Sequence, residues 1–248
     1  KVYTPRKLGL YTRADQFSSL IAMNFAFVLQ RVSFPVLTEC STDLSKLTKA
    51  YRKLLITSAF FGSLFFFSLC AAADHFIVVL IGEKWLEAVP ILRILALSAV
   101  FQPLVVLHQN ILQVFGHGKL FLRLEIVRIL FSVLVISVGV YLGFVYMLWG
   151  LVIAGIFSFC LYGYFGGLNL LDFALPWQIR SLLPSLCGSA LLALSIYIVG
   201  LPISSNLLAL AVQLILFLCG AGVLMFYVFP EQGQQILTVV NRKRLQVS

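Results

Sequence analysis

Seven long apolar stretches restrict the fold of this 248-residue sequence more than any other feature. An α-helix needs about 20 apolar residues to cross the hydrocarbon layer of a bilayer, which is about 30 Å thick. The stretches are continuously apolar and do not alternate with a period of two, which argues against a membrane β-barrel. They run approximately over residues 16–38, 54–81, 89–115, 120–142, 144–166, 181–201 and 207–229. The sequence therefore predicts an all-α, polytopic membrane protein with about seven transmembrane helices.

The composition agrees with a lipid environment. Hydrophobic residues make up 61% of the chain and charged residues 11%, whereas soluble domains have about 45–50% and about 25%. So few charges cannot cover a soluble globule, which excludes soluble enzymes, secreted disulfide scaffolds and disordered tails. The net charge of +9 comes from basic residues between the apolar stretches and does not indicate nucleic-acid binding. The five cysteines are widely spaced, so neither a metal site nor a disulfide framework is expected.

The basic residues between the stretches predict the orientation of the chain. Alternate connections and the C-terminal tail hold 11 lysines and arginines, whereas the opposite connections hold two, Lys84 and Arg93. Because cytoplasmic connections are rich in Lys and Arg, the first set and the C-terminus are expected in the cytoplasm. The segment before the first stretch disagrees, since it places four basic residues outside. The 11 residues are Lys46, Lys49, Arg52, Lys53, Lys119, Arg123, Arg128, Arg180, Arg242, Lys243 and Arg244.

Residues 41–55 have the pattern of a short amphipathic helix at the membrane surface. Leucines and a tyrosine recur at helical spacing, and lysines lie on another face. An interfacial helix that contacts anionic head groups and an ordinary basic loop are both consistent with this pattern. The apolar positions are Leu44, Leu47, Tyr51 and Leu54.

Polar side chains inside the apolar stretches are candidates for substrate binding, because each is costly in hydrocarbon unless it faces protein or water. Arg13 and Arg31 lie 18 residues apart in the sequence, about 27 Å along a helix, so they are expected near opposite ends of the first span. Both arginines either bind an anionic substrate or extend to the membrane surface. In the third span, Gln102, Gln109 and Gln113 follow one helical face.

Two further features of the spans carry structural predictions. Pro103 cannot donate a backbone hydrogen bond, so a kink is expected in the middle of the third span. Transporters bind substrate near such broken helices, whereas hydrogen bonding between helices is the alternative role for the polar residues around it. Glu125 and Arg128 are spaced for an ion pair within one helix.

Motifs for catalysis are missing from the sequence. There is no complete phosphate-binding loop, no H-E-x-x-H and no G-x-S-x-G. We therefore expect neither an enzyme nor a cofactor or metal ion.

Four short segments, in order, resemble bacterial polysaccharide transporters, which are O-antigen and exopolysaccharide flippases of the multidrug/oligosaccharidyl-lipid/polysaccharide exporter superfamily. Residues 8–14 (LGLYTRA) resemble the family's LGYYNRA, and residues 31–35 (RVSFP) are similar to RVLFP. Residues 50–53 (AYRK) and 82–90 (GEKWLEAVP) follow in the family's order. Hydropathy extends the likeness from about residue 130 to the end.

The resemblance implies a fold and a function. The chain would be the second lobe of a two-lobe flippase, with a bundle over residues 1–166 and two additional helices and a basic tail over residues 167–248. Because it starts at Lys1 without an initiator methionine, we expect it to lack the N-terminal half of the same protein. The family moves undecaprenyl-pyrophosphate-linked oligosaccharide from the cytoplasmic to the outer leaflet of the bacterial inner membrane.

This function would make the lipid-linked oligosaccharide and membrane lipids the partners of a monomeric protein. Two alternatives stay open at this point: a multidrug or small-molecule antiporter of the same superfamily, and a membrane scaffold that transports nothing. The expected substrate-binding residues are Arg13, Arg31, Gln102, Gln109 and Gln113.

Overall fold

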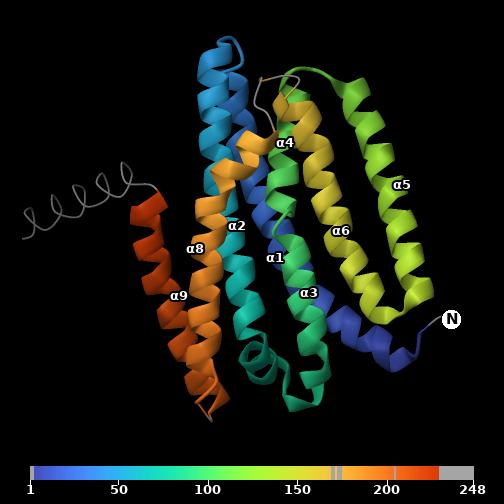
Figure 1. The fold of residues 1–248 in the computed structure, drawn as a ribbon, viewed down its shortest axis with the longest axis vertical. Coiled ribbons are helices and arrows are strands. Elements are labelled where there is room, and N and C mark those ends of the chain that lie inside the picture. Colours follow the sequence, from blue (N-terminus) through green and yellow to red (C-terminus); the bar gives the residue numbers. More distant parts are fainter. Residues whose placement is uncertain (1–2, 169–170, 172–174, 204, 229–248) are drawn as a thin grey trace, which may run out of the picture.

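Long helices run side by side along the structure, which is a computed structural model (Figure 1). It describes residues 3–168, 171, 175–203 and 205–228. The elements in chain order are α1 (Pro5–Glu39), α2 (Leu44–Ile81), the 3₁₀ turn η1 (Glu83–Ala88), α3 (Val89–Ala99), α4 (Gln102–Val114), α5 (Gly118–Leu142), α6 (Phe144–Tyr162), the π-helical turn η2 (Gly163–Leu168), α8 (Leu175–Gly200) and α9 (Asn206–Val228).

The predicted fold class is confirmed. Within the described residues, seven segments are long and apolar enough to cross a membrane, and each overlaps one of the predicted stretches. η1, α3 and α4 together form the third of them, Glu83–Val114. Helices α1 and α2 have 35 and 38 residues, which is about 52 and 57 Å at 1.5 Å per residue and exceeds the hydrocarbon layer. Figure 1 shows their joined ends rising beyond α4, α5 and α6.

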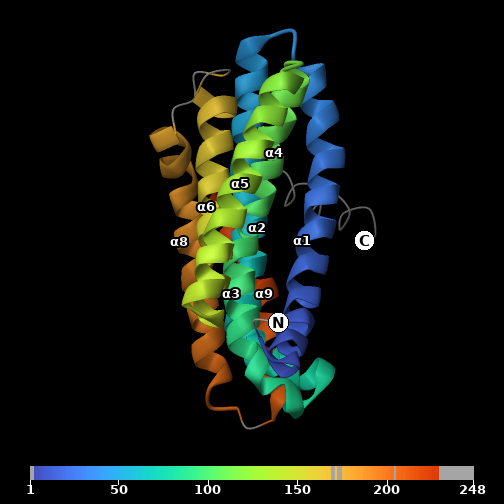
Figure 2. The same cartoon turned by 90° about the vertical axis from the view of Figure 1, so that its right-hand side faces the viewer.

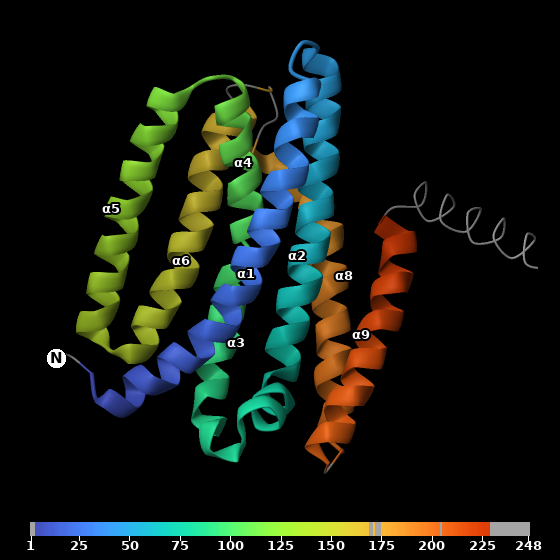
Figure 3. The ribbon, with the colours of Figure 1, turned by 180° about the vertical axis from the view of Figure 1, so that it is seen from behind.

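Helix α1 crosses the paired helices α3 and α4 on one face of the bundle (Figure 3). Its first residues reach the turn between α5 and α6, where the hydroxyl of Tyr3 donates to the carbonyl of Val140 at 3.2 Å. Helix α8 packs along α2 on the opposite side of the molecule from α1 (Figure 2), and α9 packs on α8 and α2. The division of the chain at residues 166 and 167 stays a prediction, and the basic residues 242–244 lie outside the described residues.

The break in the third span occurs at Pro103, as the sequence predicts. Helix α3 ends at Ala99 and α4 begins at Gln102, so the proline occupies the first turn of a new helix. A proline at this position costs the helix no hydrogen bond, because the backbone N–H groups of the first turn have no acceptors within the helix. The chain continues with a 3.0 Å hydrogen bond from the backbone N–H of Val105 to the carbonyl of Phe101.

Of the two alternatives for residues 41–55, the ordinary basic loop is wrong, because residues 44–55 are helical and lead directly into the second span. Residues 44–81 form one continuous helix, which starts after Asp43, whose carboxylate accepts hydrogen bonds from the backbone N–H groups of Ser45 and Lys46. No proline interrupts α2, and Leu47 and Tyr51 are completely buried in the protein. At Leu47 and Tyr51 the apolar face of this segment therefore packs against the bundle, whereas Leu44 is exposed, and contact with anionic head groups stays a prediction.

Helices α5 and α6 form a close hairpin that positions the polar residues described below. Gly143 has a φ of 138°, which side-chain-bearing residues rarely adopt, and it forms the turn between them. At Gly139 the helices approach so closely that a Cβ atom would lie 2.7 Å from the Cα of Met147. Further along, the rings of Phe131 and Phe157 stack with centroids 3.8 Å apart.

Large apolar side chains cover the outer surface of the bundle. On α5, Leu130 is 64% exposed and Leu134 61%, and on α9, Leu218 is 67% exposed. A soluble monomer rarely exposes an apolar surface of this extent, whereas lipid tails solvate it. The surface therefore agrees with the membrane environment that the composition predicts.

Candidate functional site

A polar cavity, partly open to the outside of the molecule, lies between α1, α3, α4, α5 and α6 and is called the central cavity below. Its volume is about 350 Å³, which falls in the range of roughly 300–1,000 Å³ for ligand pockets. Such a polar interior is unusual in a bundle that is otherwise so apolar, and polar groups inside a membrane mark pathways for substrates. The polar lining residues are Tyr11, Asp15, Ser18, Ser19, Ser98, Gln102, Arg128, Ser132 and Ser158.

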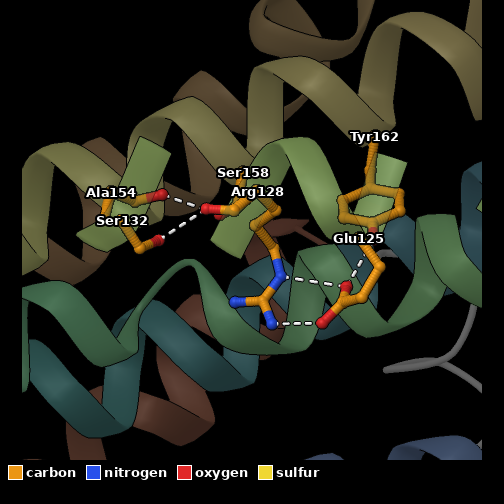
Figure 4. Close-up of polar contacts among 6 residues, drawn as sticks. All are labelled: Glu125, Arg128, Ser132, Ala154, Ser158 and Tyr162. Carbon is orange, nitrogen blue, oxygen red and sulfur yellow. Dashed lines mark hydrogen bonds and ion pairs between the residues drawn. The ribbon is translucent and has the colours of Figure 1, made fainter. Parts of the chain in front are cut away.

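Arg128 on α5 is the cation of this cavity, and it is held by Glu125 one turn earlier on the same helix (Figure 4). Its Nε donates to a Glu125 carboxylate oxygen at 3.0 Å, and a terminal nitrogen donates to the other oxygen. The predicted ion pair within one helix is therefore confirmed. From α6, the hydroxyl of Tyr162 donates to the same carboxylate at 2.6 Å. The tyrosine thus links the ion pair of α5 to α6.

Asp15 on α1 differs from the carboxylates of Asp74 and Glu125. Glu125 is paired with Arg128, and Asp74 on α2 is paired with Arg93 on α3. Among the residues that the structure describes, none donates a hydrogen bond to the Asp15 carboxylate or forms an ion pair with it. Asp15 is half-buried and lines the cavity. Its charge is therefore available to a ligand.

Two buried polar residues of α4 bond to neighbouring helices. The side-chain amide of Asn110 donates to the hydroxyl of Ser33 on α1 at 2.7 Å, and His108 forms a hydrogen bond with the hydroxyl of Tyr51 on α2. His108 and Asn110 are almost completely inaccessible. Hydrogen bonding between helices therefore holds for His108 and Asn110. Gln102 lines the cavity, and substrate binding there stays a prediction.

The five predicted substrate-binding residues lie in several places. Gln102 lines the central cavity, and Gln109 lies within hydrogen-bonding reach of Tyr162. Arg31 and Gln113 share a second, open hollow, in which the Arg31 guanidinium lies 4.2 Å from the ring centre of Phe27. At the other end of α1, the exposed Arg13 donates to Gln16 at 3.1 Å and lies 5.5 Å from the ring centre of Trp85. Substrate binding by these five residues stays a prediction.

Asp15 and the serines of the cavity are not among the substrate-binding residues that the sequence predicts. Asp15 lies just before residue 16, the start of the first predicted apolar stretch. Helical spacing was the available signal, because Tyr11, Asp15, Ser18 and Ser19 follow one face of α1. The serines on α5 and α6 carry no comparable signal, since a serine within an apolar run is ordinary in packed membrane helices.

No metal centre is evident in the part of the chain that the structure describes. It contains no group of three His, Cys, Asp or Glu side chains placed to hold a metal ion. The lipid-exposed surface and the polar cavity define the molecule as a polytopic helical membrane protein with a polar interior.

Comparison with known proteins finds similarity to proteins of polysaccharide biosynthesis. Residues 1–90 match the family described as "Polysaccharide biosynthesis protein". The teichuronic acid biosynthesis protein TuaB of Bacillus subtilis (strain 168) is 27% identical over 113 residues, which are 46% of this chain and 23% of that protein. An "uncharacterized membrane protein in cps region" of Klebsiella pneumoniae is 31% identical over 98 residues, 38% of this chain and 20% of that protein.

Over residues 1–90 the chain is therefore similar to a family of polysaccharide biosynthesis proteins, and the two relatives support a family of the polysaccharide flippase type. The matched segments span less than a quarter of the length of either relative. No solved structure matches the chain.

Proposed function

We propose that the protein is a flippase that moves an undecaprenyl-pyrophosphate-linked oligosaccharide from the cytoplasmic to the outer leaflet during surface polysaccharide synthesis. The observation that carries the proposal is the polar cavity between α1, α3, α4, α5 and α6, in a chain related to polysaccharide biosynthesis proteins. The protein acts as a transporter and makes or breaks no covalent bond.

The physical task of such a transporter fits the structure. The sugars and pyrophosphate of the substrate are strongly hydrated, so moving them through bare hydrocarbon is very costly. A cavity that offers hydroxyls, a carboxylate and an amide replaces part of that hydration, while the lipid tail stays in the bilayer against the apolar surface. The same cavity argues against a membrane scaffold that transports nothing, because the polar residues of a scaffold would only connect helices.

The relatives support the choice of substrate. One is named for the biosynthesis of teichuronic acid, and the other is a membrane protein of a cps region. Surface polysaccharides assembled from lipid-linked units need a step that carries the unit across the membrane. An antiporter of small molecules from the same superfamily would share the architecture, so the experiment below has to separate the two.

The proposed location is the bacterial inner membrane, with the end of the bundle that holds the α1–α2 and α4–α5 turns in the cytoplasm. The exposed lysines Lys46, Lys49, Lys53 and Lys119 lie at this end. Basic residues are retained on the cytoplasmic side, and the same rule places the C-terminus there.

Deletion of the gene tests the proposal. A strain without the protein, and without a second flippase, should lose its surface polysaccharide and accumulate lipid-linked oligosaccharide in the inner leaflet. Normal surface polysaccharide in that strain would contradict the proposal. A changed resistance to small toxic compounds, with normal polysaccharide, would favour the antiporter.

A further inference from the structure

The serines of the central cavity determine which chemical groups it offers to a ligand. Ser19 on α1, Ser98 on α3 and Ser132 on α5 donate their hydroxyl hydrogens to backbone carbonyls of their own helices, at 2.6, 2.8 and 2.8 Å. Ser158 on α6 does the same to the carbonyl of Ala154 at 2.7 Å (Figure 4). A hydroxyl whose hydrogen is used in this way presents its oxygen lone pairs as acceptors. Four helices around the cavity therefore each contribute an acceptor.

The charged groups of the cavity also favour a ligand that donates hydrogen bonds. The carboxylate of Asp15 has no partner among the described residues, and it can accept hydrogen bonds at both oxygens. Arg128 lines the same cavity, but its guanidinium bonds to both carboxylate oxygens of Glu125. The arginine charge is thus largely balanced, whereas the aspartate charge is not.

These groups suit a donor-rich ligand better than an anion. A phosphate brings negative charge and acceptor oxygens, which the Asp15 carboxylate repels. A sugar ring brings several O–H donors, and two neighbouring hydroxyls can bond to the two oxygens of one carboxylate. Hydrogen bonds from hydroxyls to a carboxylate are short and about twice as strong as those between neutral groups.

We propose that the central cavity is a sugar-binding subsite, in which Asp15 and the serine hydroxyls bind uncharged sugar residues of the lipid-linked oligosaccharide. The pyrophosphate is bound outside this cavity. The subsite deepens the proposed function and rests on it. At about 350 Å³ the cavity holds part of an oligosaccharide and not the whole.

Native mass spectrometry of the purified protein tests the subsite. Two probes compete for binding: the lipid-linked oligosaccharide extracted from the host strain, and polyprenyl pyrophosphate without sugar. Wild-type protein should prefer the oligosaccharide form. Asp15→Asn should bind it about tenfold more weakly, because a charge-assisted bond is lost, and should bind the bare pyrophosphate lipid as well as wild type does. That unchanged binding also shows that the variant is folded.

Further variants sharpen the test. Asp15→Glu keeps the carboxylate and should retain most of the preference, and Ser98→Ala removes one acceptor and should weaken it about threefold. Glu83→Gln removes an exposed carboxylate from the η1 turn, outside the cavity, and should behave as wild type.

Two results overturn the subsite. One is wild-type protein that binds both probes equally, and the other is an Asp15→Asn variant that retains the full preference or weakens both probes alike. If surface polysaccharide nevertheless depends on the gene, the flippase stands and only the subsite fails. If the deletion strain makes normal polysaccharide, the proposed function itself fails.

Discussion

Tyr162 on α6 donates a 2.6 Å hydrogen bond to the Glu125 carboxylate on α5, the group that also holds Arg128 beside the central cavity. One hydroxyl thus links the α5–α6 hairpin to the cation of the cavity. The relationship joins helices across 37 residues of sequence, so it fixes the position of the arginine relative to α6.

Tyr162→Phe should therefore destabilise the protein modestly. The variant loses one hydrogen bond to a charged group, which costs about 1 kcal/mol in a membrane protein. We expect the Tm of the purified protein in detergent to fall by about 2–4 °C. Tyr164→Phe is the matched control, since Tyr164 is 48% exposed. Equal Tm values for the two variants would argue against the link.

The ion pair between Glu125 and Arg128 should show energetic coupling. Replacing only one of the two residues leaves the charge of the other without its partner next to the cavity. Glu125→Ala and Arg128→Ala should therefore each lower the Tm. The double variant should lose less than the sum of the two, with a coupling energy of about 1 kcal/mol. Thermal unfolding of all four proteins measures this coupling, and additive losses would show that the pair contributes nothing.

Gly139 should not tolerate a side chain. A Cβ there would lie 2.7 to 2.9 Å from backbone atoms of Met147 and Tyr146, which cannot move without separating α5 from α6. Gly139→Ala should cost about 1–3 kcal/mol and reduce the amount of folded protein in the membrane. Gly9→Ala on α1 meets no atom within 4 Å and should be neutral or slightly stabilising. Size-exclusion profiles and Tm values compare the two, and a Gly139→Ala variant as stable as Gly9→Ala would contradict the close approach.

Arg31 should matter for export through the shape of its guanidinium. It shares a hollow with Gln113, and if it holds a phosphate, lysine keeps the charge but loses the two parallel hydrogen bonds. Arg31→Lys should lower surface polysaccharide several-fold at an unchanged protein level. Arg6→Lys changes an exposed arginine near the start of α1 and serves as the control. Wild-type export by Arg31→Lys would show that Arg31 does not bind the phosphate and only extends to the membrane surface.

Orientation can be tested with reporter fusions. Fusions after Ser45 and Gly118 should report a cytoplasmic position, because exposed lysines lie close to these turns. Fusions after Lys84 and Pro202 should report the outside. The reversed pattern would refute both the orientation and the direction of transport.

Hydropathy predicted the helices because the bilayer sets their length directly. Within the described residues the seven apolar stretches correspond to seven membrane-spanning segments, and the third is divided into α3 and α4 at Pro103. The Glu125–Arg128 pair was predictable too, since it depends only on spacing within one helix. The surroundings of residues 44–55 were not predictable, because the amphipathic pattern is the same whether the apolar face meets lipid or protein.

The cavity depends on contacts that no local pattern encodes. Asp15, Ser98, Ser132 and Ser158 come from four helices, and their common position follows from how α1 crosses the bundle. Of the predicted residues, Gln102 lines the cavity, whereas Arg31 and Gln113 meet in a separate hollow. Sequence spacing placed the glutamines on one face of the third span but could not tell which cavity each one lines.

The leaflet position of the substrate tests the central claim most directly. Spheroplasts of the deletion strain and of the complemented strain are treated with an externally added, membrane-impermeant glycosidase that cleaves the host's oligosaccharide. In the complemented strain most of the lipid-linked oligosaccharide should be cleaved, whereas in the deletion strain it should stay intact behind the membrane. Equal cleavage in both strains, with no second flippase present, would contradict transport by this protein.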